Sequence, residues 1–190
     1  EPHDSIERYE SLGVEVHTGN ARLRTPWEVE VDGRVLTTRN VVIATGARPR
    51  VPAIPGIELI TPLTSDNLWD LRVQPKRLVV LGSGPIGMEL AQAFQRLGSQ
   101  VTVFSRNDQV MPKEEPEAVE FVKASMQQDG VHFVLSSRFK RVEGTEPGEP
   151  VRVVLDRNGE EEYHEFDGLL IATGSEVQIA LEAQSKLADD

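Results

Sequence analysis

The sequence predicts an α/β fold in which a doubly wound, mainly parallel sheet carries a β-meander and is preceded by part of a related domain. Two observations lead to this prediction. A glycine-rich turn at residues 82–87 separates a short apolar run from an amphipathic stretch. In addition, two segments of the chain share one order of expected elements, and both end Ala-Thr-Gly.

The first observation defines a strand, a turn, a helix and a second strand between residues 77 and 104. The apolar and β-branched run at 77–81 is typical of a buried parallel strand. After the turn, apolar residues recur at helical spacing on one expected face: Ile86, Leu90, Ala93, Phe94 and Leu97. Gly98 is a suitable helix stop, and residues 101–104 give the second strand. Together these elements make a β-α-β unit of about 30 residues.

Each glycine of the turn has a physical task in such a unit. Gly82 permits the tight turn, Gly84 lets the backbone approach a pyrophosphate, and Gly87 lets helix and strand pack closely. The helix N-terminus then presents free N–H groups and a positive dipole end to that pyrophosphate. The sequence therefore predicts a Rossmann-like dinucleotide site, the alternative being a purely structural glycine turn.

The second observation is an internal repeat. In each copy a polar helical run ends at a glycine and is followed by a short strand, a β-hairpin and an apolar strand ending Ala-Thr-Gly, at 44–46 and 172–174. Asp32-Gly33 and Asn158-Gly159 predict the hairpin turns. The first copy has no room for a glycine turn ahead of it, so we expect a truncated first module. The alternative is that meanders merely resemble one another.

The end of the second strand bears on the choice between NAD and NADP. NAD-selective sites place Asp or Glu there to accept hydrogen bonds from the ribose 2′-OH. This chain has Ser105 at that position and Arg106 next, and a guanidinium is a natural partner for a 2′-phosphate. The sequence therefore favours NADPH over NADH. Asp108 weakens the local positive field, and Arg106 as an ordinary solvent-facing loop residue remains the alternative.

Composition excludes several function classes. The net charge of −11 and pI near 4.9 disfavour nucleic acid and anionic membranes as partners. The absence of cysteine excludes a thiol nucleophile, a redox disulfide and a thiolate metal site within this chain. No apolar run approaches the roughly 20 residues of a membrane-spanning helix, and no targeting pattern opens the chain. We therefore expect a cytoplasmic protein.

The remaining candidates indicate structure rather than chemistry. The four histidines are scattered, so no metal site is expected. The helix predicted at 116–128 places Val119, Val122 and Met126 on one face, which suggests packing against the sheet. No Ser–His–Asp arrangement is recognisable, and no catalytic residue is expected in this chain.

Roughly residues 3–175 resemble the class I pyridine nucleotide-disulfide oxidoreductases. The run at 88–99 is most similar to mercuric reductases, and the Gly-Pro-Ile-Gly turn is more similar to dihydrolipoamide dehydrogenases; glutathione reductases belong to the same family. The paired Ala-Thr-Gly ends support the resemblance. Departures are Pro112, with Lys113 beside it, where NADPH-using members present a second arginine, and Ser175-Glu176-Val177 in place of Arg-x-Pro.

The resemblance implies a domain organisation. Residues 1–50 would be the last part of the first segment of an FAD domain, and residues 51–175 the NAD(P)-binding domain, with the crossover near 49–62. The tail, 176–190, is unassigned. The missing FAD-domain segments and a C-terminal dimerisation domain would lie outside this chain, and the parent would be a homodimer. The redox cysteines would also lie outside, so the fragment alone should be inactive.

The resemblance also implies roles for single residues. Ile86 would lie against the nicotinamide, Glu89 would help to orient it, and Gly174 would lie beside the dinucleotide. Ala44, Thr45 and Gly46 would lie near FAD. The candidate residues for the dinucleotide are thus Gly82, Ser83, Gly84, Pro85, Ile86, Gly87, Met88, Glu89, Ser105, Arg106 and Gly174.

The expected function is that of the NAD(P)H-binding portion of an FAD-dependent oxidoreductase. The parent would pass hydride from NADPH to FAD and on to a disulfide or related acceptor, in the manner of mercuric reductase. An NADH-linked, dihydrolipoamide dehydrogenase-like enzyme is one alternative. A non-catalytic nucleotide-binding module is the other.

Overall fold

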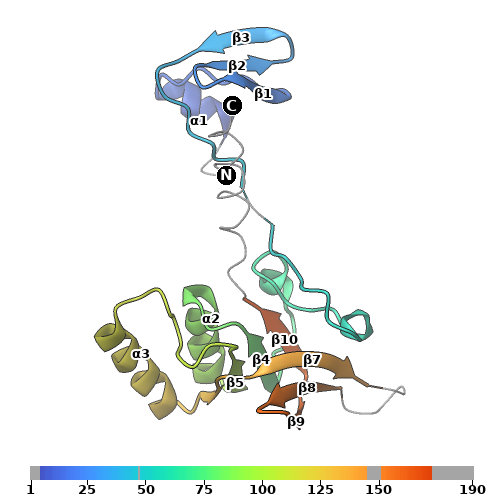
Figure 1. Cartoon of the computed structure of the whole chain (residues 1–190). Coiled ribbons are helices and arrows are strands. Elements are labelled where there is room, and N and C mark those ends of the chain that lie inside the picture. The colour runs from blue at the N-terminus through green and yellow to red at the C-terminus, as the bar shows by residue number, and fades with distance from the viewer. Residues whose placement is uncertain (1–4, 47, 145–150, 173–190) are drawn as a thin grey trace. The chain divides into compact units, whose positions relative to one another are not determined.

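The computed structural model describes residues 5–46, 48–144 and 151–172. The chain forms two compact units that divide after Gly46. The first unit is a small helix-and-meander module, and the second holds the parallel sheet (Figure 1). None of the described helices is long and apolar enough to cross a membrane.

The first unit consists of helix α1 (Ile6–Ser11) and an antiparallel meander. Its strands are β1 (Ala21–Thr25), β2 (Glu28–Val31) and β3 (Arg34–Thr37), paired in that order. Asp32 and Gly33 join β2 to β3 with φ values of 45° and 89°. The turn predicted at these two residues is therefore confirmed, because a primed turn needs positive φ at both central positions. The expected hairpin is extended by a third strand.

Two strands expected in the first unit do not form. Residues 14–16 and 41–44 are irregular, and Val42 and Ile43 are 86% and 54% exposed. A strand persists only when its backbone groups are paired. No described strand lies beside 41–44, whereas the corresponding strand of the second copy, β10 (Gly168–Ile171), is paired in parallel with β4 (Arg77–Leu81).

The second unit is built on a four-stranded parallel sheet of order β10-β4-β5-β6. Strand β5 spans Gln100–Phe104 and β6 spans His132–Val134. Helix α2 (Pro85–Arg96) connects β4 to β5, and α3 (Pro116–Gln128) connects β5 to β6. The predicted β-α-β unit and parallel sheet are therefore confirmed.

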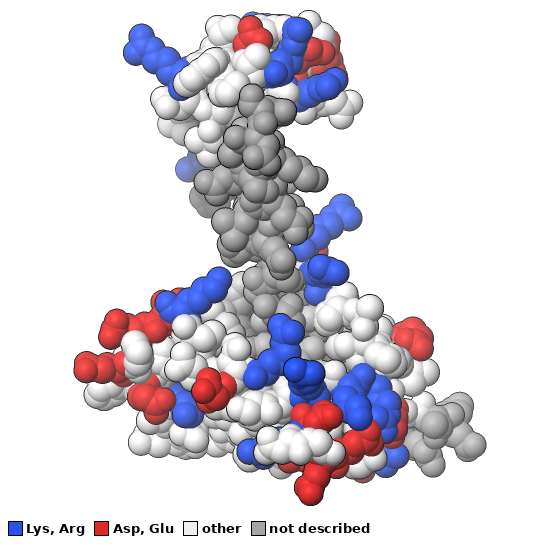
Figure 2. Space-filling view, in the orientation of Figure 1, with Lys and Arg blue, Asp and Glu red and all other residues white. Residues whose placement is uncertain are grey.

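A second meander belongs to this unit. Strands β7 (Arg138–Glu143), β8 (Arg152–Arg157) and β9 (Glu160–Glu165) pair antiparallel in that order. Asn158 and Gly159 join β8 to β9 with φ values of 56° and 88°, as the sequence predicts. Basic and acidic side chains are interleaved over this meander (Figure 2), and many of them form ion pairs.

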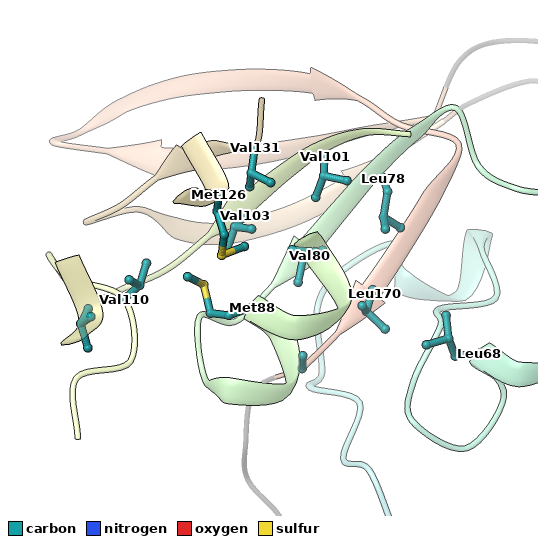
Figure 3. Close-up of a cluster of buried hydrophobic side chains, with 13 residues drawn as sticks. Leu68, Leu78, Val80, Met88, Val101, Val103, Val110, Met126, Val131 and Leu170 are labelled. Atoms are coloured by element: carbon teal, nitrogen blue, oxygen red, sulfur yellow. The ribbon is translucent and has the colours of Figure 1, made fainter. Parts of the chain in front are cut away.

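The two faces of the parallel sheet are covered differently. Alternate sheet residues, among them Val80 and Val103, pack against α2 and α3 (Figure 3). The residues between them, among them Val79 and Phe104, pack against the second meander. This alternation follows from the two-residue period of a strand, and burial on both faces explains why residues 78–81 of β4 are all apolar.

The buried faces of the helices differ from those that the sequence suggests. In α2, Leu90 and Phe94 pack half-buried against the core as expected, but Ile86 and Leu97 are 48% and 69% exposed. The residues of α2 that are fully buried are Gly87, Met88 and Ala91. In α3, Val119 and Met126 are buried as expected, but Val122 is 40% exposed. The spacing of apolar residues fixes the side of a helix that faces the sheet only to within about one residue. Packing against the sheet determines which residues are buried.

The segment before β4 crosses over the second meander. Ile54 is buried in the cluster formed with the meander, and the Val142 N–H donates to the Pro55 carbonyl at 2.8 Å. Two short 3₁₀ turns follow, η1 (Ile57–Leu59) and η2 (Leu68–Asp70). Leu63 forms a parallel bridge with Leu170, which brings this segment to the edge of the sheet at β10.

Candidate dinucleotide-binding site

The glycine-rich turn begins where β4 ends and finishes in the first turn of α2. Gly82 has φ 112°, a conformation that favours glycine, and its N–H donates to the Phe104 carbonyl at 3.0 Å. The turn is thereby joined to the end of β5. It lies at the carboxyl ends of the parallel strands, the edge at which open α/β sheets bind ligands.

Gly84 and Gly87 occupy opposite environments. A Cβ atom built on Gly87 would lie 2.5 Å from the Gly82 carbonyl oxygen and 3.2 Å from the Ala172 Cβ. A Cβ built on Gly84 would meet no atom within 4 Å. The structure therefore gives Gly87 a role in close packing and leaves open space in front of Gly84.

The N-terminus of α2 faces that open space without a capping side chain. Gly84 is the N-cap residue, no side chain caps the helix, and Pro85 occupies the first turn. The first intrahelical bond runs from the Met88 N–H to the Gly84 carbonyl. The N–H groups of the first turn have no intrahelical partner and remain available to an anion.

A pocket opens beside this helix terminus. Gly84, Pro85 and Ile86 form one side of it, and the end of β10 with Ala172 forms another; Leu90 and Ser65 complete the lining, together with Leu170 and Ile171. Sequence reasoning identified the first three residues but missed Ser65, Leu90 and the strand residues. Ser65 carries no motif, since the fold of the crossover alone brings it to the pocket.

The side chain of Ser105, which follows β5, is buried. Ser105 is 5% exposed, and its Oγ lies 2.8 Å from the Oγ of Ser83, which is 4% exposed. The same Oγ accepts a hydrogen bond from the Asn107 N–H at 3.2 Å. The hydroxyl of Ser105 is therefore engaged inside the fold. The side chain of Arg106 is exposed, and within the described ranges it makes no hydrogen bond or ion pair.

The loop after Arg106 returns to the glycine-rich turn. Val110 is fully buried in the core, and the Met111 N–H donates to the Ser83 carbonyl at 2.8 Å. Pro112 stands where the family resemblance places a second arginine in NADPH-using members, and Lys113 follows it. Both residues are exposed. The loop therefore borders the turn at both of its ends.

The other candidate residues are distributed as follows. Met88 is 2% exposed and packs in the core, so its side chain faces away from the site, whereas Glu89, the next residue of α2, is exposed. Ala44, Thr45 and Gly46 are exposed and belong to the other unit. Gly174 and the tail at 176–190 lie outside the described residues. Among the described residues no cluster of His, Asp or Glu could hold a metal ion.

Comparison with known proteins identifies the family of the chain. The family model described as pyridine nucleotide-disulphide oxidoreductase matches residues 3–189. A mercuric reductase from Lysinibacillus sphaericus is 40% identical over 171 residues, which are 90% of this chain and 30% of that protein. A dihydrolipoyl dehydrogenase from Acholeplasma laidlawii is 31% identical over 86% of this chain and 48% of its own length.

Among solved structures, an HOCl-induced flavoprotein disulfide reductase from Escherichia coli is similar with a TM-score of 0.65 and 29% identity. It is matched over 88% of this chain and 39% of that one. The chain thus spans less than half the length of each of these relatives. Since the family model covers nearly all 190 residues, the chain belongs to the pyridine nucleotide-disulphide oxidoreductase family.

Proposed function

We propose that the glycine-rich turn of the second unit binds NAD(P)H, with the pyrophosphate against the N-terminus of α2. The observation that carries the proposal is the open space at Gly84 directly in front of an uncapped helix N-terminus. A pyrophosphate there would accept hydrogen bonds from the N–H groups of the first turn, and the helix dipole would stabilise its charge.

The nicotinamide end would lie in the pocket lined by Ile86. Its walls are mainly apolar, with Leu90 and the end of β10 opposite, and such walls suit a flat ring. Glu89, exposed one helical turn on, would orient the ring. When bound, the reduced nicotinamide supplies a hydride, and these residues only hold and orient the ring.

The adenosine end would be read by Arg106, with NADPH preferred to NADH. Its guanidinium is exposed and has no partner among the described residues, so a 2′-phosphate would not compete with an existing ion pair. Ser105 brings no negative charge to this position. Because its hydroxyl is already bonded to Ser83, we propose that it acts by leaving room rather than by contacting the ribose.

The intact protein would be an FAD-dependent oxidoreductase that passes hydride from NADPH to FAD and on to a disulfide or related acceptor. Residues 51–175 would be its NAD(P)-binding domain, and residues 1–50 would belong to the FAD domain. Gly46 has φ 74° and stands in an exposed segment that FAD could approach. The described part of the first unit has no glycine-rich turn of its own, so a complete FAD site would need residues beyond those described. A homodimeric, cytoplasmic parent remains a prediction from the sequence.

Two features favour an NADH-linked, dihydrolipoamide dehydrogenase-like function instead. Asp108 lies two residues after Arg106, and Pro112 stands where a second arginine would complete a phosphate clamp. A non-catalytic nucleotide-binding module would require the same turn. The first alternative differs from our proposal in its ratio of affinities for NADPH and NADH.

The test is calorimetric titration of the chain with NADPH and with NADH. We expect NADPH to bind more tightly, and the Arg106→Ala variant to lose roughly tenfold in NADPH affinity, the usual size of one charge-assisted contact, with NADH affinity unchanged. Arg157→Ala is the matched control, because it removes an equal charge from the last residue of β8, in the second meander. This change should alter neither affinity. Equal or tighter binding of NADH would contradict the cofactor assignment, and binding of neither would contradict the site.

A further inference from the structure

We propose that Ser83 is a positioning residue for recognition of the adenosine 2′-substituent, acting through Ser105 on the backbone that carries Arg106. The inference rests on the proposed function of the glycine-rich turn. It adds a residue whose side chain would touch neither the pyrophosphate nor the ribose, since Ser83 is 4% exposed and its hydroxyl points to Ser105.

The link between the two serines joins two parts of the site that are far apart in the sequence. Ser83 lies in the turn that would hold the pyrophosphate, and Ser105 follows β5, where the ribose would be read. Their Oγ atoms are 2.8 Å apart, and both side chains are buried. A hydrogen bond in such surroundings is stronger than in water and is costly to leave unmade.

The Ser105 Oγ transmits this constraint to the residue after Arg106, and main-chain bonds hold the two neighbours of Arg106. The Ser105 carbonyl accepts from the Ser137 N–H at 3.0 Å, and the Ser105 Oγ accepts from the Asn107 N–H at 3.2 Å. The Asn107 carbonyl in turn accepts from the Ser136 N–H at 2.9 Å. The residues before and after Arg106 are therefore fixed, while its own side chain is exposed and has no described partner to orient it.

Ser83 also holds the far end of the same loop. Its carbonyl accepts from the Met111 N–H at 2.8 Å, next to the fully buried Val110. The loop from Arg106 to Met111 is thus attached to Ser83 at its start by a side chain and at its end by the main chain. Replacing the Ser83 hydroxyl removes the side-chain bond to Ser105 and leaves the main-chain bond from Met111. The loop would therefore stay folded while the backbone at Arg106 becomes more mobile.

This arrangement separates positioning from stability. When both partners of a buried hydrogen bond are replaced by apolar groups, stability can remain nearly unchanged, because no unsatisfied group is left behind. The double variant Ser83→Ala/Ser105→Ala should therefore fold about as well as the single variants or better. It should nevertheless lose the placement of Arg106, because the pair no longer fixes the turn to the end of β5.

The experiment measures the affinities of the 190-residue chain for NADPH and for NADH by calorimetry, in the wild type and in each variant. We expect Ser83→Ala to lower the ratio of NADPH to NADH affinity by roughly three- to tenfold, the effect of one ordinary hydrogen bond. Ser105→Ala should lower it by at least this factor, because it also removes the bond from the Asn107 N–H. The double variant should lower it no further than Ser105→Ala alone, since Ser83 acts through the Ser105 hydroxyl.

Ser99→Ala is the matched control. Ser99 is also buried, at 2% exposed, and its hydroxyl donates to the Pro75 carbonyl at 2.7 Å, but it precedes β5 at the opposite end of the sheet. This change should lower the free energy of unfolding without altering the affinity ratio. A general loosening of the fold would change the affinity ratio of the Ser99 variant as well. Loss of the position of Arg106 would leave the ratio of that variant unchanged.

The outcomes separate the inference from the proposed function. If the wild type prefers NADPH and Ser83→Ala keeps the same ratio, or weakens both ligands equally, the positioning role is wrong and the proposed site stands. If the wild type has no preference, the assignment of NADPH is wrong and the inference with it, and if it binds neither ligand, the proposed site is wrong as well. Should Ser83→Ala not fold, Ser83→Cys keeps the volume with a much weaker donor and is judged by the same ratio.

Discussion

Gly87 lies directly against the carbonyl oxygen of Gly82, so that the first turn of α2 and the end of β4 are in backbone contact. A Cβ atom at Gly87 would lie 2.5 Å from that oxygen, and 3.2 Å from the Ala172 Cβ at the end of β10. Gly84, three residues earlier, has open space where its Cβ would be. This pair of glycines allows packing and ligand binding to be tested separately.

The change Gly87→Ala should destabilise the second unit. Alanine is favoured over glycine in a helix by about 1 kcal/mol, but forcing a methyl group against backbone typically costs about 1–3 kcal/mol. Since the clash is with a carbonyl that also belongs to the turn, we expect a net loss of about 1–2 kcal/mol. Denaturant unfolding followed by circular dichroism measures it, and unchanged stability would contradict the close packing.

The change Gly84→Ala should weaken binding instead of folding. Its φ of −74° and ψ of 173° are available to alanine, and the added methyl group meets nothing in the protein. Stability should therefore stay within about 0.5 kcal/mol, while NADPH affinity falls roughly tenfold or more because the methyl group occupies the space of the pyrophosphate. If affinity were retained, the ligand would not approach this backbone.

Gly56 joins the crossover segment to the second meander. It has φ 80°, and a Cβ there would collide with the Val142 carbonyl. We expect Gly56→Ala to lower the free energy of unfolding by at least about 2 kcal/mol, from backbone strain and overpacking together. Gly159→Ala is the control, because it has a similar φ of 88° but no neighbour within 4 Å. For Gly159→Ala the free energy of unfolding should fall by only about 1 kcal/mol, the cost of the backbone strain alone. Equal losses in the two variants would contradict the contact at Val142.

The ion-pair network on the second meander should make the fold sensitive to acid. Glu161 accepts hydrogen bonds from Arg141, Lys140 and Tyr163, which hold the pKa of its carboxyl far below the usual range. A depressed pKa in the folded state stabilises the fold above the unfolded pKa of about 4.3, and this contribution is lost as the pH falls below it.

We therefore expect the free energy of unfolding to fall between about pH 5 and pH 2, and Glu161→Gln to reduce that dependence. Denaturant unfolding across this range measures the slope for both proteins. Glu114→Gln removes an exposed carboxylate that has no ion pair in the described part of the chain, and its slope should match the wild type. If the Glu161 variant kept the wild-type slope, the network would not govern the acid response.

Local chemistry explains which features could be predicted from the sequence. The turns at Asp32-Gly33 and Asn158-Gly159 have positive φ because short-range sterics favour these residues there. The β4-turn-α2-β5 unit follows from a continuous apolar run next to an amphipathic helix. These features need no knowledge of how other parts of the chain pack.

The features that the sequence did not predict depend on contacts with distant parts of the chain. The expected strand at 41–44 is apolar enough, but no described strand pairs with it. The rotation of α2 that buries Met88 and exposes Ile86 is set by the sheet beneath the helix. The inward hydroxyl of Ser105 depends on Ser83, 22 residues away, and Ser65 reaches the pocket only through the crossover. No local pattern signals such contacts.

The central claim is that a dinucleotide binds at the start of α2, and a titration of the ¹⁵N-labelled chain with NADPH, followed by amide NMR, tests it most directly. We expect the largest shift changes at the amides of Gly84, Ile86 and Gly87, with a second group near Arg106, and little change in the second meander. NADH should reproduce the first group and weaken the second. Shift changes confined to the meander, or none at saturating ligand, would contradict the claim.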